Sequence, residues 1–344
     1  MQALLLAGGL GTRLRPLTEH LPKPMAPVVN RPWLEHLLKH LRSQGLSDFV
    51  IAVKHNADII RNHFGDGRRL GVTIAYSQEP ELLGTAGAIK HAEPLLSADR
   101  FIVVNADIIH HVDLMPLLEF HRSSGAMVTI GLTEVEDPSQ YGVVQQTPSG
   151  RILRFVEKPP RHEAPSNRIN AGIYVMEKET LSWIPAGRAV SIERETFPLL
   201  IRKGLPVYGC AVRGYWLDMG THDRYLALHR DALDGKIGLQ LPYPMKAEGV
   251  WIGEDTHISS HAKLIPPVVI GRGTRVERGA VLGPYAVLGE GVTVQADSRC
   301  AHAVVLPGTR LEGNRVFRHA VVAPDFMVTT RLPGDLIRQG VMQP

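Results

Sequence analysis

The amino-acid sequence predicts an α/β domain with a mainly parallel sheet, followed by a short β-helix of hexapeptide repeats. Three observations carry this prediction. A brief apolar run at residues 3–7 ends in closely spaced glycines, and short apolar runs then alternate with longer amphipathic ones as far as residue 233. From residue 252 onward, aliphatic residues recur at every sixth position. Alternating strands and helices are typical of a sheet covered on both faces, and a six-residue period is typical of stacked β-helix coils.

The opening segment predicts a loop that binds phosphate groups. Its apolar run is short and uncharged, which indicates a buried strand, and Gly8, Gly9 and Gly11 follow directly. Glycines at the end of a strand permit a tight turn and bring backbone N–H groups close to an anion. Arg13 and Lys23 add positive charge, which suits a polyphosphate. The segment lacks both the Gly-Lys-Ser/Thr of a P-loop and the third glycine of a dinucleotide fingerprint.

The pattern that follows predicts the rest of the α/β domain. The expected strands are residues 49–53, 72–76, 101–104 and 127–132, and the expected helices are residues 33–44 and 55–64. In open parallel sheets, ligands bind at the carboxyl ends of the strands. The site is therefore expected at the edge of the sheet where the glycine loop lies.

The six-residue period predicts the inward positions of the β-helix. Counting by sixes gives Ile252, Ile258, Leu264, Ile270, Val276, Leu282, Leu288, Val294, Cys300 and Leu306. A second register of small or β-branched residues gives Ala262, Val268, Thr274, Ala280, Ala286, Val292, Ser298 and Val304. Stacking several such turns buries a continuous core, and roughly three coils are expected.

Composition agrees with a globular protein of the cytoplasm. The 344 residues are 44% hydrophobic and 21% charged, and the net charge of +4 comes without a long basic run, so nucleic acid is not a predicted partner. Cys210 and Cys300 are isolated from each other, which fits a reducing compartment. No uncharged span approaches about 18 residues and no basic segment precedes the first apolar run, so neither a membrane helix nor a signal peptide is predicted.

The opening motif resembles the G-x-G-T-R-L-x-P-L-T…P-K-P signature of the sugar-1-phosphate nucleotidyltransferases. The L-G-T-A-G turn at residues 83–87, the F-V-E-K-P segment at 155–159 and S-I-E-R-E at 191–195 look most similar to mannose-1-phosphate guanylyltransferases. The resemblance covers nearly the whole chain, including the hexapeptide repeats. It implies a Rossmann-like nucleotidyltransferase domain (residues 1–233), a linker (234–248), a left-handed β-helix (249–323) and a C-terminal tail (324–344).

The resemblance also implies the site residues. The nucleotide-binding residues would be Leu6, Ala7, Gly8, Gly9, Gly11, Thr12, Arg13, Lys23, Gln78, Gly84, Thr85 and Asp107, with the base held near Gln78 and by the turn at residues 83–87. The sugar-phosphate-binding residues would be Tyr141, Gly142, Glu157, Lys158, Asn170, Gly172 and Asp218. Arg13, Lys23, Asp107 and Asp218 would be catalytic.

Asp107 and Asp218 would together hold Mg²⁺. Asp107 follows the strand at residues 101–104, and Asp218 lies in a W-x-D-x-G-T pattern at residues 216–221. Magnesium prefers oxygen ligands, usually one or two carboxylates together with phosphate and water. The expected reaction is transfer from a nucleoside triphosphate, with GTP favoured, to a sugar 1-phosphate, with mannose 1-phosphate favoured. The attacking phosphate is already ionised at neutral pH, so no general base is expected.

Several alternatives stay open on the sequence. The same reaction is compatible with heptose or glucose 1-phosphate as the acceptor, and with dTTP, UTP or ATP as the nucleotide. A second alternative is an additional acyltransferase activity of the β-helix, with one of its histidines as the catalytic residue; these are His257, His261, His302 and His319. A third alternative is that the chain is a non-catalytic regulatory paralogue. A homo-oligomer is expected through the β-helix. Lys90, His110 and His111 are expected on the solvated surface, and residues 336–338 as a cap on the last coil.

Overall fold

The computed structural model describes residues 1–330, which form two compact units. Unit 1 comprises residues 1–11, 18–25 and 34–216, and unit 2 comprises residues 12–17, 26–33 and 217–330 of the described chain. Two short segments near the N-terminus therefore cluster with the C-terminal part of the chain. The expected cap at residues 336–338 lies outside the described residues.

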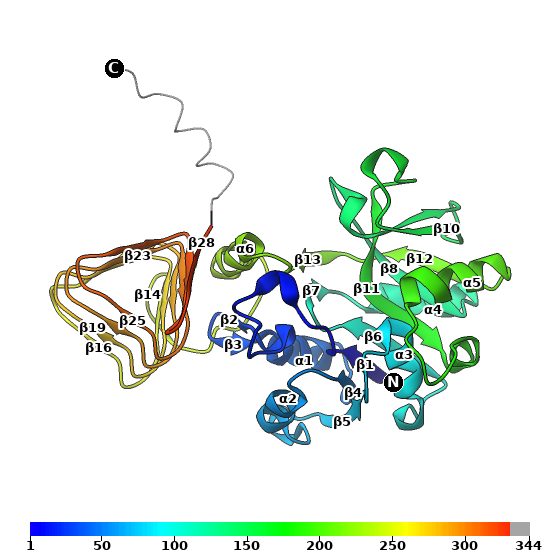
Figure 1. The fold of residues 1–344 in the computed structure, drawn as a ribbon, viewed down its shortest axis with the longest axis horizontal. Coiled ribbons are helices and arrows are strands. Elements are labelled where there is room, and N and C mark those ends of the chain that lie inside the picture. The colour runs from blue at the N-terminus through cyan, green and yellow to red at the C-terminus, as the bar shows by residue number, and fades with distance from the viewer. Residues whose placement is uncertain (331–344) are drawn as a thin grey trace, which may run out of the picture. The chain divides into compact units, whose positions relative to one another are not determined.

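Unit 1 alternates strands with helices (Figure 1). Its helices are α1 (Trp33–Ser43), α2 (Ala57–Phe64), α3 (Gly84–His91), α4 (Met115–Ser124) and α5 (Phe197–Arg202). Its strands are β1 (Gln2–Leu6), β4 (Asp48–Val53), β5 (Thr73–Gln78), β6 (Arg100–Asn105), β7 (Ile108–Val112), β8 (Val128–Glu134), β9 (Gly142–Gln146), β10 (Ile152–Glu157), β11 (Arg168–Glu177) and β12 (Val207–Ala211). β13 (Gly214–Asp218) runs from unit 1 into unit 2.

The main sheet of unit 1 has a parallel part and an antiparallel part. The strand order is β10-β9-β11-β6-β1-β4-β5; β8 also pairs with β11, and β12 pairs with β8. Strands β6, β1, β4 and β5 are parallel, whereas β11 is antiparallel to β6, β8 and β9. Leu6 lies opposite both Ala52 and Asn105, so β1, β4 and β6 end at the same edge of the sheet. The α/β fold is confirmed, and the parallel strands bring the glycine loop to this edge.

The helix expected at residues 33–44 is present as α1, and its apolar face is buried. Leu34, Leu37, Leu38 and Leu41 recur at helical spacing and are fully buried. No helix within residues 1–330 has the length and apolar character needed to cross a membrane.

Unit 2 contains a short hairpin, a helix and the β-helix. The hairpin strands are β2 (Pro27–Val28) and β3 (Arg31–Pro32), and the helix is α6 (His222–Leu233). The first β-helix face consists of β15 (Val250–Ile252), β18 (Val268–Ile270), β21 (Ala286–Leu288), β24 (Ala303–Val305) and β27 (Ala320–Val322), flanked by antiparallel β14 (Met245–Ala247) and β28 (Met327–Thr329). The second consists of β16 (His257–Ile258), β19 (Arg275–Val276), β22 (Thr293–Val294) and β25 (Arg310–Leu311), and the third of β17 (Lys263–Leu264), β20 (Val281–Leu282), β23 (Arg299–Ala301) and β26 (Val316–Arg318).

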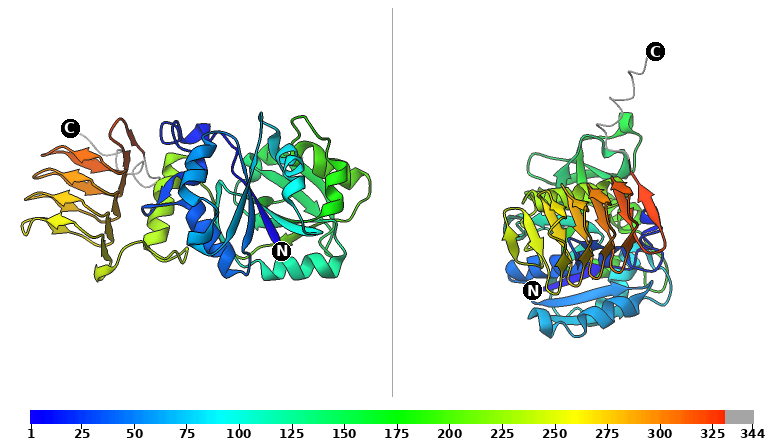
Figure 2. Two further views of the ribbon diagram at one scale, coloured as in Figure 1. Left: turned by 90° about the horizontal axis from the view of Figure 1, so that it is seen from below. Right: turned by 90° about the vertical axis from the view of Figure 1, so that its left-hand side faces the viewer.

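The three faces stack parallel strands from coil to coil, as expected of a left-handed β-helix (Figure 2). The second and third faces have four parallel strands each within the described chain, so the coils number about four rather than the three expected. Aliphatic side chains fill the interior, among them Ile270, Leu282 and Leu288. On the outside of the first face, α6 contacts β24 and β27.

The six-residue count is correct as far as Cys300 and wrong after it. Leu288 pairs with Val305, and Ala286 pairs with Ala303, so both inward registers move back by one residue. Val305 is buried, whereas Leu306 lies in the turn that follows β24 and is partly exposed. The cause is a corner that is one residue shorter: in its turn His302 takes a positive φ of 49°. Leu306 and Val304 are therefore not inward positions.

Candidate active site

A pocket of about 290 Å³ lies in unit 1 where β1 and β6 end. It is lined by Leu6, Ala7, Gly8, Gly9, Gly11, Lys23, Pro24, Glu79, Leu82, Gly84, Thr85, Ala88, Asn105 and Asp107. Most of the predicted nucleotide-binding residues are thus brought together from four separate segments. Thr12 and Arg13 belong to unit 2, and Gln78 is exposed and does not line the pocket.

The glycine loop is held in a conformation that other residues would strain. Gly11 has a φ of +60°, and a Cβ there would lie 3.0 Å from the Cβ of Lys23. The hydroxyl of Thr18 donates a hydrogen bond of 2.8 Å to the Gly11 carbonyl and fixes the loop. The loop therefore packs directly against the segment that carries Lys23.

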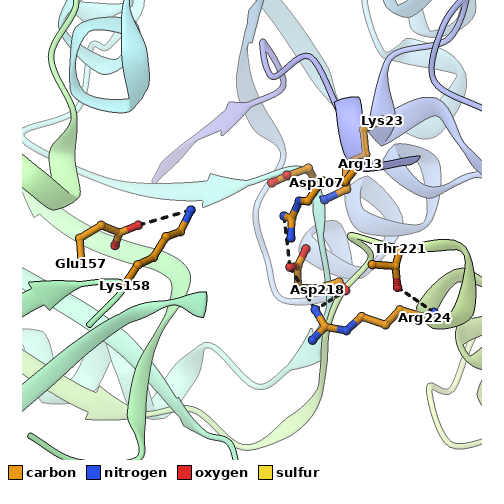
Figure 3. A network of polar contacts seen from close by, with 8 residues as sticks. All are labelled: Arg13, Lys23, Asp107, Glu157, Lys158, Asp218, Thr221 and Arg224. Atoms are coloured by element: carbon orange, nitrogen blue, oxygen red, sulfur yellow. Dashed lines mark hydrogen bonds and ion pairs between the residues drawn. The ribbon is translucent and has the colours of Figure 1, made fainter. Parts of the chain in front are cut away.

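Lys23 and Asp107 form an ion pair in this pocket (Figure 3). Lys23 Nζ lies 3.0 Å from Asp107 Oδ2; the lysine side chain is only 5% exposed, whereas that of Asp107 is 43% exposed. A buried ammonium needs a compensating anion, which Asp107 supplies. The exposed side of the Asp107 carboxylate leaves room for a ligand.

Glu79, which the sequence analysis did not select, takes the place expected for Gln78. Gln78 is the last residue of β5 and points to solvent, whereas Glu79 is 4% exposed and lines the pocket. Glu79 Oε2 accepts a hydrogen bond from the backbone N–H of Leu83 at 3.1 Å. Burial raises the pKa of the Glu79 carboxyl above its ordinary value, and the Leu83 N–H opposes this rise.

Gly8 leaves room for the Glu79 carboxylate beside the loop. A Cβ at Gly8 would lie 2.5 Å from Glu79 Oε1. At Gly9, by contrast, a Cβ would meet nothing within 4 Å. Of these two neighbouring glycines, only Gly8 has a close neighbour that a side chain would meet.

All the predicted sugar-phosphate residues except Asp218, which belongs to unit 2, lie in unit 1. Glu157 at the end of β10 pairs with Gly142 in β9, and the Lys158 N–H donates to the Tyr141 carbonyl at 2.9 Å. A Cβ at Gly142 would lie 2.9 Å from Glu157 Oε2, so glycine leaves room for that carboxylate. Lys158 Nζ lies 3.9 Å from Glu157 Oε1. Burial, and next the negative charge of Glu193, raise the pKa of Glu157.

Asn170 and Gly172 shape the strand beside this segment. The Asn170 side chain accepts from the Gly172 N–H at 2.9 Å and donates to the Tyr174 hydroxyl at 2.8 Å. Gly172 has a φ of +73°, and a Cβ there would lie 2.9 Å from Nδ2 of Asn105, a pocket residue. The Trp216 indole N–H donates to the Ala171 carbonyl at 3.0 Å.

Glu193 connects the segment at residues 191–195 to Thr85, a residue of the pocket. Its Oε2 accepts hydrogen bonds from the Thr85 hydroxyl at 2.7 Å and from the Ser191 hydroxyl at 2.8 Å. The Thr85 hydroxyl in turn accepts from the Ile192 N–H at 2.8 Å. The resemblance at residues 191–195 includes Glu193 but implies no role for it, because no local pattern in the sequence predicts that it lies beside Thr85.

In unit 2, Asp218 is bracketed by two arginines (Figure 3). Its Oδ2 lies 3.4 Å from Arg13 Nη2 and 3.3 Å from Arg224 Nη1. A Cβ at Gly220 would lie 2.9 Å from Arg13 Nη1 and 3.0 Å from Asp218 Oδ2. Glycine at this position of the W-x-D-x-G-T pattern therefore leaves space for the Arg13–Asp218 contact.

The expected surface position of His110 is wrong. His110 in β7 is fully buried and its ring packs against that of His40, with 6.2 Å between centroids. Burial lowers the pKa of His110 to about 3, with His40 and His111 adding to the effect. His111 is partly buried, and Lys90 pairs with Glu93 at 2.7 Å. The sequence around His110 matches no motif, and it does not show that β7 buries this histidine.

The histidines of the β-helix are arranged as surface and corner residues. His302 stacks on His319 with 5.0 Å between ring centroids and on Tyr285 with 5.2 Å, at the same corner of successive coils. His257 and His261 are exposed. Across residues 1–330, no group of three or more His, Cys, Asp or Glu side chains is arranged to hold a metal ion.

Comparisons with known proteins identify a family whose members resemble the α/β part of this chain. The model of the Nucleotidyl transferase family matches residues 2–235. The chain is 40% identical over 236 residues to a mannose-1-phosphate guanylyltransferase of Mycobacterium tuberculosis, covering 68% of this chain and 65% of that protein. It is 38% identical over 267 residues to a UTP–glucose-1-phosphate uridylyltransferase of Synechocystis, covering 74% of this chain and 69% of that protein.

Among solved structures, HddC from Yersinia pseudotuberculosis in complex with GMP-PN is 28% identical with a TM-score of 0.58, covering 67% of this chain and 99% of that chain. A putative glucose-1-phosphate thymidylyltransferase from Bacillus anthracis is 25% identical with a TM-score of 0.61, covering 72% and 98%. The family match spans well over half of the chain and contains every strand of the main sheet. The chain belongs to the Nucleotidyl transferase family.

Proposed function

We propose that the protein transfers a nucleotidyl group from a nucleoside triphosphate to a sugar 1-phosphate, with release of pyrophosphate. The observation that carries the proposal is the unit 1 pocket, which combines a glycine loop with the Lys23–Asp107 ion pair. Backbone N–H groups and a buried ammonium suit a polyphosphate. The family match and the relatives named as guanylyltransferase and uridylyltransferase support the same reaction class.

The chemistry requires two polyanions to approach each other. A phosphate oxygen of the sugar 1-phosphate attacks the α-phosphorus in line, a new P–O bond forms, and pyrophosphate leaves. Lys23 is placed to offset charge on the triphosphate, and Lys158 to offset charge on the sugar phosphate. Glu157 accepts hydrogen bonds from sugar hydroxyls. The attacking phosphate is already ionised, so the chain's own groups need only position the reactants.

The donor set fits Mg²⁺. Asp107 offers a carboxylate with an exposed side within the pocket, and Asp218 offers a second carboxylate in unit 2. Magnesium is typically held by one or two carboxylates, with the remaining positions filled by phosphate and water. When bound with the nucleotide, Mg²⁺ would offset charge on the α-phosphate and on the leaving pyrophosphate.

Glu79 favours GTP as the nucleotide. Guanine presents two neighbouring donors, N1–H and the N2 amino group, which an ionised carboxylate accepts together. Uracil and thymine present one donor flanked by carbonyl oxygens, and these oxygens would repel the same carboxylate. A buried polar group left without a partner strongly disfavours the wrong base. Glu79 is buried and lines the pocket beside Gly84 and Thr85, where the base is expected.

Mannose 1-phosphate is the favoured acceptor. The support is the 40% identity to the M. tuberculosis guanylyltransferase and the 38% identity over 278 residues to a mannose-1-phosphate guanylyltransferase of Arabidopsis thaliana. Glucose 1-phosphate with UTP is the second candidate, because a relative of similar identity has that name. The Glu79 carboxylate disfavours UTP, because it would repel the carbonyl oxygens of uracil.

The test is a measurement of pyrophosphate release across a grid of GTP, UTP, dTTP, ATP and CTP against mannose, glucose and heptose 1-phosphates. Strong release with GTP and mannose 1-phosphate is the expected result. Release with UTP and glucose 1-phosphate alone would overturn the role given to Glu79. Tight nucleotide binding without release from any pair would instead indicate a regulatory, non-catalytic member of the family.

A further inference from the structure

Glu79 is a buried carboxylate within an exposed connection. It directly follows β5, and the residues on either side of it, Gln78 and Pro80, are exposed. The Glu79 side chain is only 4% exposed and lines the unit 1 pocket. A carboxylate that recognises a base must keep its oxygens in fixed positions, which requires support from neighbouring residues. The contacts that hold this connection therefore bear on the choice of nucleotide.

The end of β4 holds the connection on both sides of Glu79. The Glu79 N–H donates to the Val53 carbonyl at 3.0 Å, which continues the pairing of β4 with β5 by one residue. Lys54, the next residue along the chain, donates a hydrogen bond from Nζ to the Pro80 carbonyl. A Cβ at Gly8 would lie 3.5 Å from the Lys54 Cβ and 2.5 Å from Glu79 Oε1. The Lys54 side chain thus begins beside the same glycine as the carboxylate.

His91 makes a second side-chain contact with this connection. It is the last residue of α3, and its Nε2–H donates to the Gln78 carbonyl at 3.0 Å. Burial raises the pKa of the Glu79 carboxyl, and the Leu83 N–H opposes this rise most strongly. Positive charges on His91 and Lys54 oppose it as well. Both side chains therefore favour the ionised carboxylate, which accepts hydrogen bonds through both oxygens.

The contact made by Lys54 contributes little to the fold itself. His91 lies at the end of a helix, where a cation is favourable in its own right, whereas Lys54 belongs to no helix or strand. Ordering a long lysine side chain costs conformational entropy, and a hydrogen bond near the surface returns only a modest free energy. The main consequence of the contact is therefore local, because it fixes Pro80 next to Glu79.

We propose that Lys54 is a positioning residue that fixes the Glu79 carboxylate for recognition of guanine. This inference rests on the proposed function, because it needs the base to lie beside Glu79. Guanine binds both carboxylate oxygens only when its N1–H and its N2 amino group face them together. Inosine triphosphate (ITP) has the same N1–H but lacks the amino group, so the preference for GTP over ITP measures the second hydrogen bond. Loss of Lys54 is expected to lower this preference rather than nucleotide affinity in general.

The experiment is isothermal titration calorimetry with GTP and with ITP, without a sugar 1-phosphate so that no transfer occurs. The wild type should bind GTP about tenfold or more tightly than ITP, as expected for a hydrogen bond to a charged group. Lys54→Met removes the ammonium but keeps most of the length, and should lower the GTP-to-ITP preference by about three- to tenfold, the contribution of one ordinary hydrogen bond. Lys54→Arg, which can also donate to a carbonyl, should retain most of the preference.

The matched control is Lys39→Met, which removes an ammonium of α1 that pairs with Glu35 at 2.7 Å. This control should show the wild-type preference for GTP. Lys54→Gln, with a shorter neutral side chain, provides a second version of the Lys54→Met test. Melting temperatures of all the variants show whether each is folded.

The results separate this proposal from the proposed function. An unchanged GTP-to-ITP preference in folded Lys54→Met and Lys54→Gln would overturn the positioning role. An equal loss of affinity for both nucleotides would also overturn it, because Lys54 would then act on a part that the two nucleotides share. Wild-type protein that binds neither nucleotide would instead overturn the proposed function, and wild-type protein that binds both equally would overturn the role given to Glu79.

Discussion

In the pocket of unit 1, each residue has a contact that no neighbour repeats, whereas in the β-helix of unit 2 the same contact recurs from coil to coil. Lys23 meets Asp107, and Gly8 makes room for Glu79. In the β-helix, Ile270, Leu288 and Val305 occupy the same place in successive coils. Substitutions in the pocket should each change activity in a way that depends on the individual residue. Substitutions in the β-helix should lower stability by an amount that depends on how deeply the side chain is buried.

The largest effect is expected at Asp107. Asp107→Asn keeps the size of the side chain but removes the negative charge that faces Lys23 and that would hold the proposed Mg²⁺. Turnover should fall about 1,000-fold, since a metal ion contributes several kcal/mol to stabilising charge in the transition state. The measurement is pyrophosphate release with GTP and mannose 1-phosphate.

The matched control for this change is Asp99→Asn, an exposed carboxylate just before the opposite end of the same strand, β6. It should retain wild-type turnover. Equal activity of the Asp107 and Asp99 variants would contradict the proposal that the reaction takes place in the unit 1 pocket.

The next largest effect is expected in the β-helix core. Leu288→Ala should lower the free energy of unfolding by about 2–5 kcal/mol, because Leu288 is fully buried among other coils. Leu306→Ala, at a partly exposed position, should cost less than about 1 kcal/mol. Denaturant unfolding of the two variants checks the register directly. A larger loss from Leu306→Ala would favour the uninterrupted six-residue count.

Glu79 is expected to control the choice of base. In Glu79→Gln the amide accepts one hydrogen bond but presents an N–H₂ group to the second guanine donor. The value of kcat/KM for GTP should fall about 10- to 100-fold, since hydrogen bonds to charged groups contribute about 1.5–3 kcal/mol. Activity with UTP should rise relative to GTP, because an amide matches both the donor and the acceptor of uracil. Unchanged selectivity across the nucleotide grid would contradict the assignment.

The smallest effect is the pH dependence of stability at the same residue. Burial raises the pKa of folded Glu79 above its ordinary value of 4.5, so the ionised carboxylate destabilises the fold. This destabilisation is fully present above the folded pKa and disappears as the pH falls below the unfolded pKa. Glu79→Gln should therefore melt above the wild type at neutral pH, by a margin that shrinks as the pH approaches 4.5. A margin that grows on acidification would have the wrong sign.

The sequence predicted the features that depend on local pattern. The glycine loop, the helix face of Leu34, Leu37 and Leu38, and the grouping of Lys23 with Asp107 all follow from spacing and from the rule that parallel strands end at one edge. The features that it missed depend on single-residue shifts. One residue less at the corner near His302 moved the inward register from Leu306 to Val305.

The exchange of Gln78 for Glu79 has a related cause. Side chains alternate along a strand, and Gln78 is the last residue of β5, so its outward direction is set by strand parity. The family resemblance implied a base held near Gln78, and no local pattern in the sequence shows that the chain turns Glu79 inward beside Gly8. Likewise, the ion pair of Arg224 with Asp218 depends on the tertiary position of α6 and has no local signature.

The most direct test of nucleotidyl transfer follows the phosphorus atoms of GTP. The protein is incubated with Mg²⁺, mannose 1-phosphate and GTP labelled with radioactive phosphorus at either the α or the γ position, and the products are separated. Label from the α position should appear in the nucleotide sugar, and label from the γ position in pyrophosphate. Label from the γ position in the sugar product, or no sugar-linked α label with any sugar 1-phosphate tested, would contradict the account.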